Sequence, residues 1–98
     1  MGVKVFISQP FGNKSKIEIK KERRELKREL ERQGYEVLET IIELEEGASP
    51  LKYLAKLIEI MDEADVVMFM EGWSSARGCV IEHEVALRYG KFVIELGR

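Results

Sequence analysis

The sequence predicts a small α/β domain in which four parallel strands carry three helices. Strand-like and helix-like segments alternate along the 98 residues, and the chain begins and ends with a strand-like segment. Residues 65–70 are continuously apolar after their aspartate, as strands buried on both faces of a parallel sheet are. Because crossovers between parallel strands are right-handed, we expect a doubly wound, flavodoxin-like or Rossmann-like sheet of order 2-1-3-4.

The first half of the chain predicts strand, helix and strand. Residues 3–8 are rich in β-branched side chains and end at a cluster of turn residues, 9–13. Ser15 is expected to cap a helix that runs to about residue 33, since Glu18 completes a capping box. Gly34 is typical of the position that follows a helix. A strand is expected over 35–42, and an acidic loop over 43–48.

The second half predicts helix, strand, helix and strand. Ser49 and Pro50 mark the start of a helix whose apolar side chains recur at helical spacing to Met61. The buried strand 65–70 is followed by a loop over 71–78 and a helix over 79–89, with Gly90 after it. Residues 92–96 form the last predicted strand. Without repeats or linkers, residues 1–98 are expected to be a single domain.

Composition narrows the class of partner. The formal net charge is −2, so the chain has no bulk attraction for a nucleic acid polymer or a membrane. No apolar run approaches the length of a membrane span, and the first residues lack a signal-peptide pattern, so a cytoplasmic location is expected. One cysteine and one histidine make neither a disulfide nor a zinc site, and we expect no metal or other cofactor.

The candidate chemistry lies in residues 72–86, around Glu82. Ligands of doubly wound sheets bind beyond the carboxyl ends of the strands where the strand order reverses, here between loops 9–15 and 71–78. Glu82 shares a helical face with small and apolar residues, where an unpaired carboxylate is costly. It is interpreted as a nucleophile or ligand anchor, or alternatively as half of a buried salt bridge with Arg23. The neighbouring His83 and Glu84 are expected to be exposed, and Cys79 to be a small core residue.

Side chains of the two loops complete the predicted pocket. Trp73 is expected either to stack on a planar base or to cover the edge of the domain. Ser74, Ser75 and Arg77 precede a helix, and they are expected to bind a phosphate at its N-terminus. The predicted binding residues are Ser8, Gln9, Phe11, Lys14, Gly72, Trp73, Ser74, Ser75, Arg77 and Gly78, with Glu82 as the candidate catalytic residue.

Several of these segments resemble one known superfamily. Residues 5–11 are similar to the opening strand and loop of the nucleoside 2-deoxyribosyltransferase-like superfamily. Its C-terminal half is resembled by residues 64–67, by Gly72-Trp73, by residues 76–86 around Glu82, and by residues 89–91. The chain resembles in particular the small members found in bacteriophage and prophage genomes.

The resemblance implies an activity. In active members a glutamate at the position of Glu82 attacks C1′ of a 2′-deoxynucleoside or its 5′-monophosphate and forms a glycosyl ester. The base leaves, and water or a second base resolves the ester. This chain has Phe6 where active members carry a tyrosine, and Leu57 where they carry an aspartate. We therefore expect a nucleoside- or nucleotide-binding domain with deoxyribosyltransferase or N-glycosidase activity. The alternatives are a non-catalytic binder that senses or sequesters a nucleotide-derived molecule, and a structural interaction domain.

The second helix predicts self-association. It carries more apolar side chains than one side of a small sheet requires, and such an excess commonly marks an interface. A homodimer or higher homo-oligomer is expected, with Tyr53 near the interface; alternatively all of this surface belongs to the core. The residues concerned are Leu51, Tyr53, Leu54, Leu57, Ile58 and Met61.

Overall fold

A computed structural model describes residues 2–40 and 47–98, and its centre is a parallel sheet of four strands. The strands are β1 (Lys4–Ser8), β2 (Glu36–Val37), β3 (Val66–Phe69) and β4 (Phe92–Glu95). Their order is β2-β1-β3-β4, and Phe6 of β1 lies opposite Val67, which in turn lies opposite Val93. The predicted α/β class and strand order are confirmed.

The three predicted helices are present among the described residues. They are α1 (Lys16–Arg32), α2 (Pro50–Met61) and α3 (Arg77–Arg88), and a short 3₁₀ helix, η1 (Trp73–Ser75), precedes α3. Both predicted caps form. The Ser15 hydroxyl accepts the Glu18 N–H at 3.2 Å, and the Ser49 hydroxyl accepts the Lys52 N–H at 3.1 Å. Each cap satisfies a backbone donor that the first turn of a helix leaves unpaired.

Two segments differ from the prediction. Strand β2 is two residues long. Beyond it, the Leu38 N–H still bonds the Val5 carbonyl, and the Thr40 hydroxyl bonds the Ile7 carbonyl. Residues 41 and 42 of the expected strand, and 43–46 of the expected loop, lie outside the described residues. The expected loop 71–78 contains η1, and α3 begins at residue 77. The turn into η1 is made by Gly72, whose φ of 94° favours glycine.

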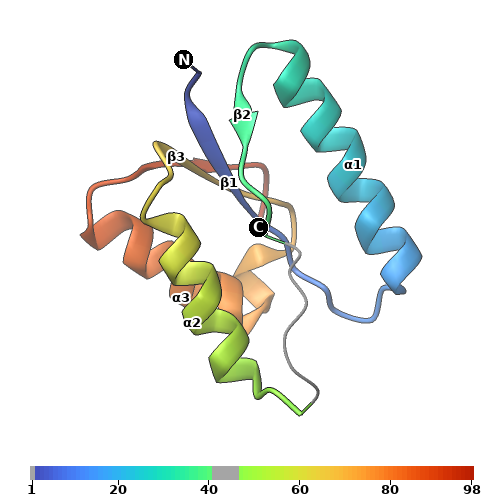
Figure 1. Ribbon diagram of the computed structural model, residues 1–98. Helices are drawn as coiled ribbons and strands as arrows, with labels where there is room; N and C mark the ends of the chain where they lie inside the picture. The colour runs from blue at the N-terminus through green and yellow to red at the C-terminus, as the bar shows by residue number, and fades with distance from the viewer. Residues whose placement is uncertain (1, 41–46) are drawn as a thin grey trace.

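Helix α1 lies on one side of the sheet, and α2 and α3 lie on the other (Figure 1). The sheet thus separates two apolar clusters. On one face, Val5, Ile7 and Met68 pack with Leu30 of α1. On the other face, Phe6, Val67 and Phe69 pack with side chains of α2, η1 and α3, among them Met61, Trp73, Cys79 and Ala86. Two helices therefore share one face, and the space where they diverge at the carboxyl end of β1 becomes the site described below.

No helix in the described part of the chain, residues 2–40 and 47–98, combines the length and apolarity that crossing a lipid bilayer requires.

Candidate functional site

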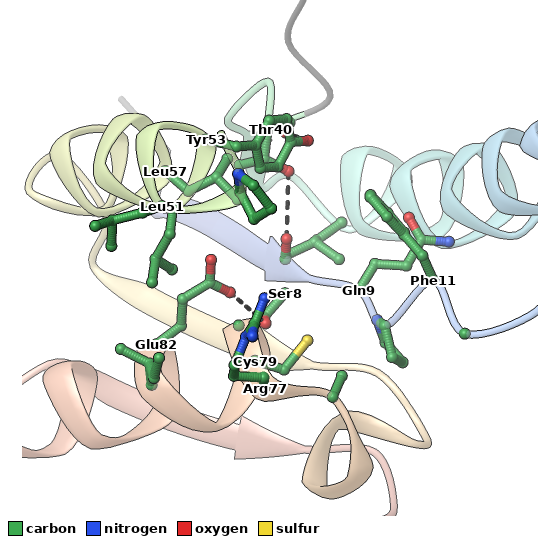
Figure 2. A pocket seen from close by; sticks show the side chains of 18 of the residues that line it. Ser8, Gln9, Phe11, Thr40, Leu51, Tyr53, Leu57, Arg77, Cys79 and Glu82 are labelled. Carbon is green, nitrogen blue, oxygen red and sulfur yellow. Dashed lines mark hydrogen bonds between the residues drawn. The ribbon is translucent and has the colours of Figure 1, made fainter. Parts of the chain in front are cut away.

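A cleft of about 900 Å³ opens at the carboxyl end of β1, between α2 and α3 (Figure 2). Its walls include Ile7 and Ser8 of β1, Leu54 and Leu57 of α2, and Glu82 of α3. The expected site lay between the loops after β1 and β3. The first loop does contribute, but from the second only residues next to or within the start of α3 line the cleft, and α2 forms a wall that the sequence did not predict.

Among the described residues that line this cleft, Glu82 is the acidic one, and only 3% of its surface is exposed. The Ser8 hydroxyl donates a hydrogen bond of 2.6 Å to the Glu82 Oε1 atom, in a buried setting. Arg23 does not form the alternative salt bridge with Glu82, because its guanidinium lies instead beside Glu39 and the Leu38 carbonyl. Glu82 therefore faces the cleft with a neutral hydroxyl as its hydrogen-bond partner.

Burial changes the protonation of the side chains in this wall. Loss of solvation raises the pKa of Glu82 to about 7, and the hydrogen bond from Ser8 opposes that rise by favouring the carboxylate. Burial likewise raises the pKa of the Cys79 thiol to about 11. At neutral pH the thiol is protonated and unreactive, and Cys79 packs in the core as expected. The carboxyl group, by contrast, is available in both protonation states.

Ser8 supplies the hydroxyl that Phe6 lacks. Phe6 packs in the core and has no polar side-chain atom, so it cannot form a hydrogen bond with Glu82. Side chains two residues apart on a strand point to the same face, and Ser8 stands two residues further along β1, at its carboxyl end. The alternation of side chains along the strand therefore predicts that the Ser8 hydroxyl lies on the same face of β1 as Phe6. Leu57, where the resemblance implies an aspartate, lines the cleft with an apolar side chain.

A second wall faces Glu82 across the cleft. The Tyr53 hydroxyl of α2 donates to the Thr40 carbonyl at 3.1 Å, and both residues line the cleft (Figure 2). The buried Arg23 of α1 lines the cleft as well. Sequence reasoning placed Tyr53 near an interface and did not include Thr40, because neither position has a local signal for a cleft between two helices.

Nine of the ten predicted binding residues divide into three groups, and Trp73 forms a fourth case. Those that line the cleft are Ser8, Gln9, Phe11, Arg77 and Gly78. Lys14 and Gly72 line a separate cavity of about 220 Å³, which Gln9 also borders, and Lys14 pairs there with Glu22 at 3.0 Å. Ser74 and Ser75 are exposed and do not line the cleft. Of the three residues expected to bind a phosphate together, Arg77 lines the cleft and the two serines do not.

Gly78 and the start of α3 leave open space in the cleft. A Cβ atom added at Gly78 would meet no heavy atom within 4 Å. Ala76, the N-cap residue, provides no side-chain hydrogen bond to the first turn. Backbone N–H groups at the start of α3 therefore remain for a ligand, next to the exposed Arg77. In the described residues, no three His, Cys, Asp or Glu side chains gather as a metal site would require.

Trp73 does not line the cleft. It is 8% exposed and packs in the core, with its ring 5.4 Å from Phe69 and stacked on His83 at 4.1 Å. His83 in turn contacts the Glu95 carboxylate, at 2.6 Å. The expectation that His83 is an exposed polar residue is wrong, because its ring fills the space between Trp73 and β4.

The structure is that of an α/β protein with a cleft at the topological switch point of its sheet. Residues 3–95 match the domain of unknown function DUF4406, and the chain belongs to this family. A search among curated proteins found no match. Since the family description names no activity, a function has to be argued from the cleft itself.

Proposed function

We propose that this protein binds a nucleoside or its 5′-monophosphate in the cleft and cleaves or transfers the N-glycosidic bond through Glu82. The observation that carries the proposal is the buried Glu82 carboxyl group, which faces a cleft of about 900 Å³ and accepts a hydrogen bond from Ser8. The volume is within the range of small-molecule sites. A strongly shifted pKa in such a cleft is a further mark of a functional residue.

The proposed chemistry has two displacements. In the first, a Glu82 carboxylate oxygen bonds to C1′, the C1′–N bond breaks, and its electron pair leaves with the base, which takes a proton from water. In the second, a water oxygen bonds to C1′ and loses a proton, and the Glu82 oxygen leaves as carboxylate. A second base in place of water gives transfer. Ser8 would hold the attacking carboxylate in position through its hydrogen bond.

One observation favours the alternative function, a binder that senses or sequesters a nucleotide-derived molecule without turnover. Leu57 gives the cleft an apolar wall where the resemblance implies an aspartate, so no acid is available there to assist the chemistry. Binding requires only the cleft, whereas turnover also requires that Glu82 be ionised and correctly placed. Release of free base distinguishes the two functions.

The proposal includes a cytoplasmic location and a homodimer or higher homo-oligomer. The single thiol, Cys79, is free and buried, which agrees with a reducing compartment. Leu51 of α2 is 73% exposed at the mouth of the cleft, and a second copy that covered it would also narrow the cleft. The resemblance to the small bacteriophage and prophage domains belongs to the same proposal.

The test is incubation of the protein with a panel of nucleosides and 5′-monophosphates, followed by chromatography for free base. The proposal predicts release from at least one substrate above the rate without protein. Glu82→Ala should reduce that release to the background rate, because it removes the covalent route.

The matched control is Glu84→Ala, which removes an exposed carboxylate on the same helix that pairs with Arg88. This variant should retain the parent rate. Release by Glu82→Ala within roughly a factor of two of the parent protein would contradict the role of Glu82. Binding without release would support the sensing or sequestering function, and no binding at all would reject both.

A further inference from the structure

Arg23 has an unused hydrogen-bond donor in the wall opposite Glu82. Its side chain is only 6% exposed, and its Nη2 atom donates to the Leu38 carbonyl at 2.9 Å. Its Nε atom lies 3.8 Å from the Glu39 carboxylate. Its Nη1 atom is buried and has no hydrogen-bond partner among the described residues. A buried donor without a partner is costly, and because Arg23 lines the cleft, a small rotation of its side chain that brings Nη1 to a ligand acceptor would be favourable.

Arg23 belongs to the wall that faces Glu82. Its partners at positions 38 and 39 directly precede Thr40, and it interacts electrostatically with Tyr53. Figure 2 shows Thr40 and Tyr53 on one side of the cleft, with Glu82 and Arg77 on the other. A ligand that reaches across the cleft would therefore have Arg77 and Glu82 on one side and Arg23 on the other.

The two arginines suit different chemical groups. Arg77 is exposed beside the free N–H groups of α3, where a strongly hydrated phosphate keeps part of its solvation. Arg23 is buried, its charge is partly offset by Glu39, and one of its nitrogens is unused. Such a group suits an uncharged planar ligand with acceptor atoms better than a dianion, whose desolvation is costly.

We propose that Arg23 binds the base of the nucleoside and donates from Nη1 to a carbonyl oxygen or ring nitrogen of that base. This inference rests on the proposed function and adds the residue that recognises the leaving group. As the C1′–N bond breaks, its electron pair places negative charge on the acceptor atoms of the base. The hydrogen bond from the guanidinium then strengthens and lowers the barrier, while the proton that neutralises the base comes from water, because arginine keeps its own.

The test separates the two ends of the ligand. Binding of hypoxanthine, a free base, and of 2-deoxyribose 5-phosphate, the sugar end, is measured by calorimetry on the parent protein, Arg23→Gln and Arg77→Gln. Arg23→Gln should weaken hypoxanthine binding on the order of 10- to 100-fold, as loss of a charge-assisted hydrogen bond does. It should leave the sugar phosphate unchanged within roughly a factor of two, since the other wall is intact. Arg77→Gln, the matched control, should give the converse pattern.

Two further measurements test the inference if Arg23→Gln does not fold. Arg23→Lys keeps the charge and the apolar stem but loses the second nitrogen, and it should also weaken hypoxanthine selectively. In the parent protein, hypoxanthine should shift the guanidinium NMR signals of Arg23, and 2-deoxyribose 5-phosphate should not.

The outcomes separate this inference from the proposed function. If the parent protein binds both probes and Arg23→Gln affects neither or only the sugar phosphate, Arg23 does not bind the base, and the proposed function stands. If the parent protein binds neither probe, this inference fails, whereas the proposed function is decided separately by the panel of nucleosides and 5′-monophosphates.

Discussion

Glu82 and His83 are adjacent in sequence, and α3 turns them toward two different environments. His83 stacks on Trp73, meets the edge of Phe69 and contacts the Glu95 carboxylate, so its ring and its nitrogen both have partners. Glu82 is more deeply buried and receives one hydrogen bond from a neutral hydroxyl. The His83 side bonds an imidazole nitrogen within the fold, although the buried indole nitrogen of Trp73 has no partner among the described residues. The other side keeps a carboxyl group whose charged form is stabilised only weakly.

The difference indicates which side stabilises the fold and which side is available to a ligand. A buried polar group with complete partners contributes to stability, but one with incomplete partners is a cost that a ligand can reduce. Arg23 is of the second kind, since its Nη1 atom has no partner among the described residues, and it lines the cleft together with Glu82, whose charged form is disfavoured by burial. Variants on the His83 side should therefore affect stability most, and variants on the Glu82 side should affect pH dependence and binding.

The largest effect on stability is expected for Trp73→Ala. Removing a buried tryptophan that packs on Phe69 and His83 should lower the free energy of unfolding by about 3–5 kcal/mol. Chemical denaturation measures this change. The control is Tyr89→Ala at the C-terminal end of α3, where the aromatic ring is 79% exposed and the change should stay within about 0.5 kcal/mol. Similar losses in the two variants would mean that the Trp73–His83 stack does not stabilise the fold.

On the Glu82 side of α3, a smaller effect is expected, and it concerns how the free energy of unfolding depends on pH. The pKa of Glu82 is about 7 in the folded protein and ordinarily 4.5, so between these pH values the folded state holds a proton that the unfolded state has lost. Stability from this residue should fall as pH rises from 4.5 to 7, by about 3 kcal/mol in total. Arg23, Tyr53, Arg77 and Cys79 line the same cleft, but the last is protonated throughout this range.

Glu82→Gln removes this titration, so the variant should be more stable than the parent protein at pH 8 and differ little from it near pH 4. Urea denaturation across that range measures the difference. Glu84→Gln, at the exposed neighbouring position, is the control and should follow the parent curve. A parent protein whose stability relative to Glu82→Gln rises with pH would contradict the raised pKa.

These two predictions also indicate what sequence reasoning could reach. The caps at Ser15 and Ser49 and the alternation of strands and helices were predictable, since each depends on residues a few positions apart. Glu82 was recognisable as a lone acid on an apolar helical face. Its bond to Ser8 joins residues 74 positions apart and depends on how α3 packs against β1, which no local pattern contains.

The residues whose positions were predicted wrongly also depend on contacts between distant elements. Trp73 and His83 carry no local signal that they stack, because their contact depends on the 3₁₀ turn that brings residue 73 over α3. The wall of the cleft formed by α2 depends on the distance between two helices on one face of the sheet. Strand β2 was predicted too long because apolar residues at an edge do not by themselves ensure pairing.

Ser8→Ala should shift a titration by about 1 pKa unit. The Ser8 hydroxyl donates to the Glu82 carboxylate, so its removal disfavours the charged form and should raise the pKa of Glu82 further. The carboxyl ¹³C shift of Glu82 reports this titration. Thr40→Ala is the control, since that hydroxyl bonds the Ile7 carbonyl instead. A lower pKa in Ser8→Ala would show that the hydroxyl does not stabilise the carboxylate.

The smallest effect on the fold is expected for Leu51→Glu, which changes a side chain that is 73% exposed. If α2 forms a homodimer, this charge should dissociate it, because an apolar interface does not accommodate two unpaired carboxylates. Light scattering at micromolar concentration should give twice the 11.3 kDa monomer mass for the parent protein and the monomer mass for the variant. A parent protein near 11.3 kDa would rule out the dimer.

The central claim is that the Glu82 side of α3 binds a nucleoside or nucleotide, and an NMR titration of the parent protein with a panel of nucleoside 5′-monophosphates tests it most directly. For at least one of them, the account predicts that the largest amide shifts occur at Ser8, Gly78, Cys79 and Glu82, which line the cleft. The indole signal of Trp73 should move little, since its ring is buried against His83. Absence of shifts with every compound, or largest shifts at Trp73 and its neighbours Ser74 and Ser75, would contradict the account.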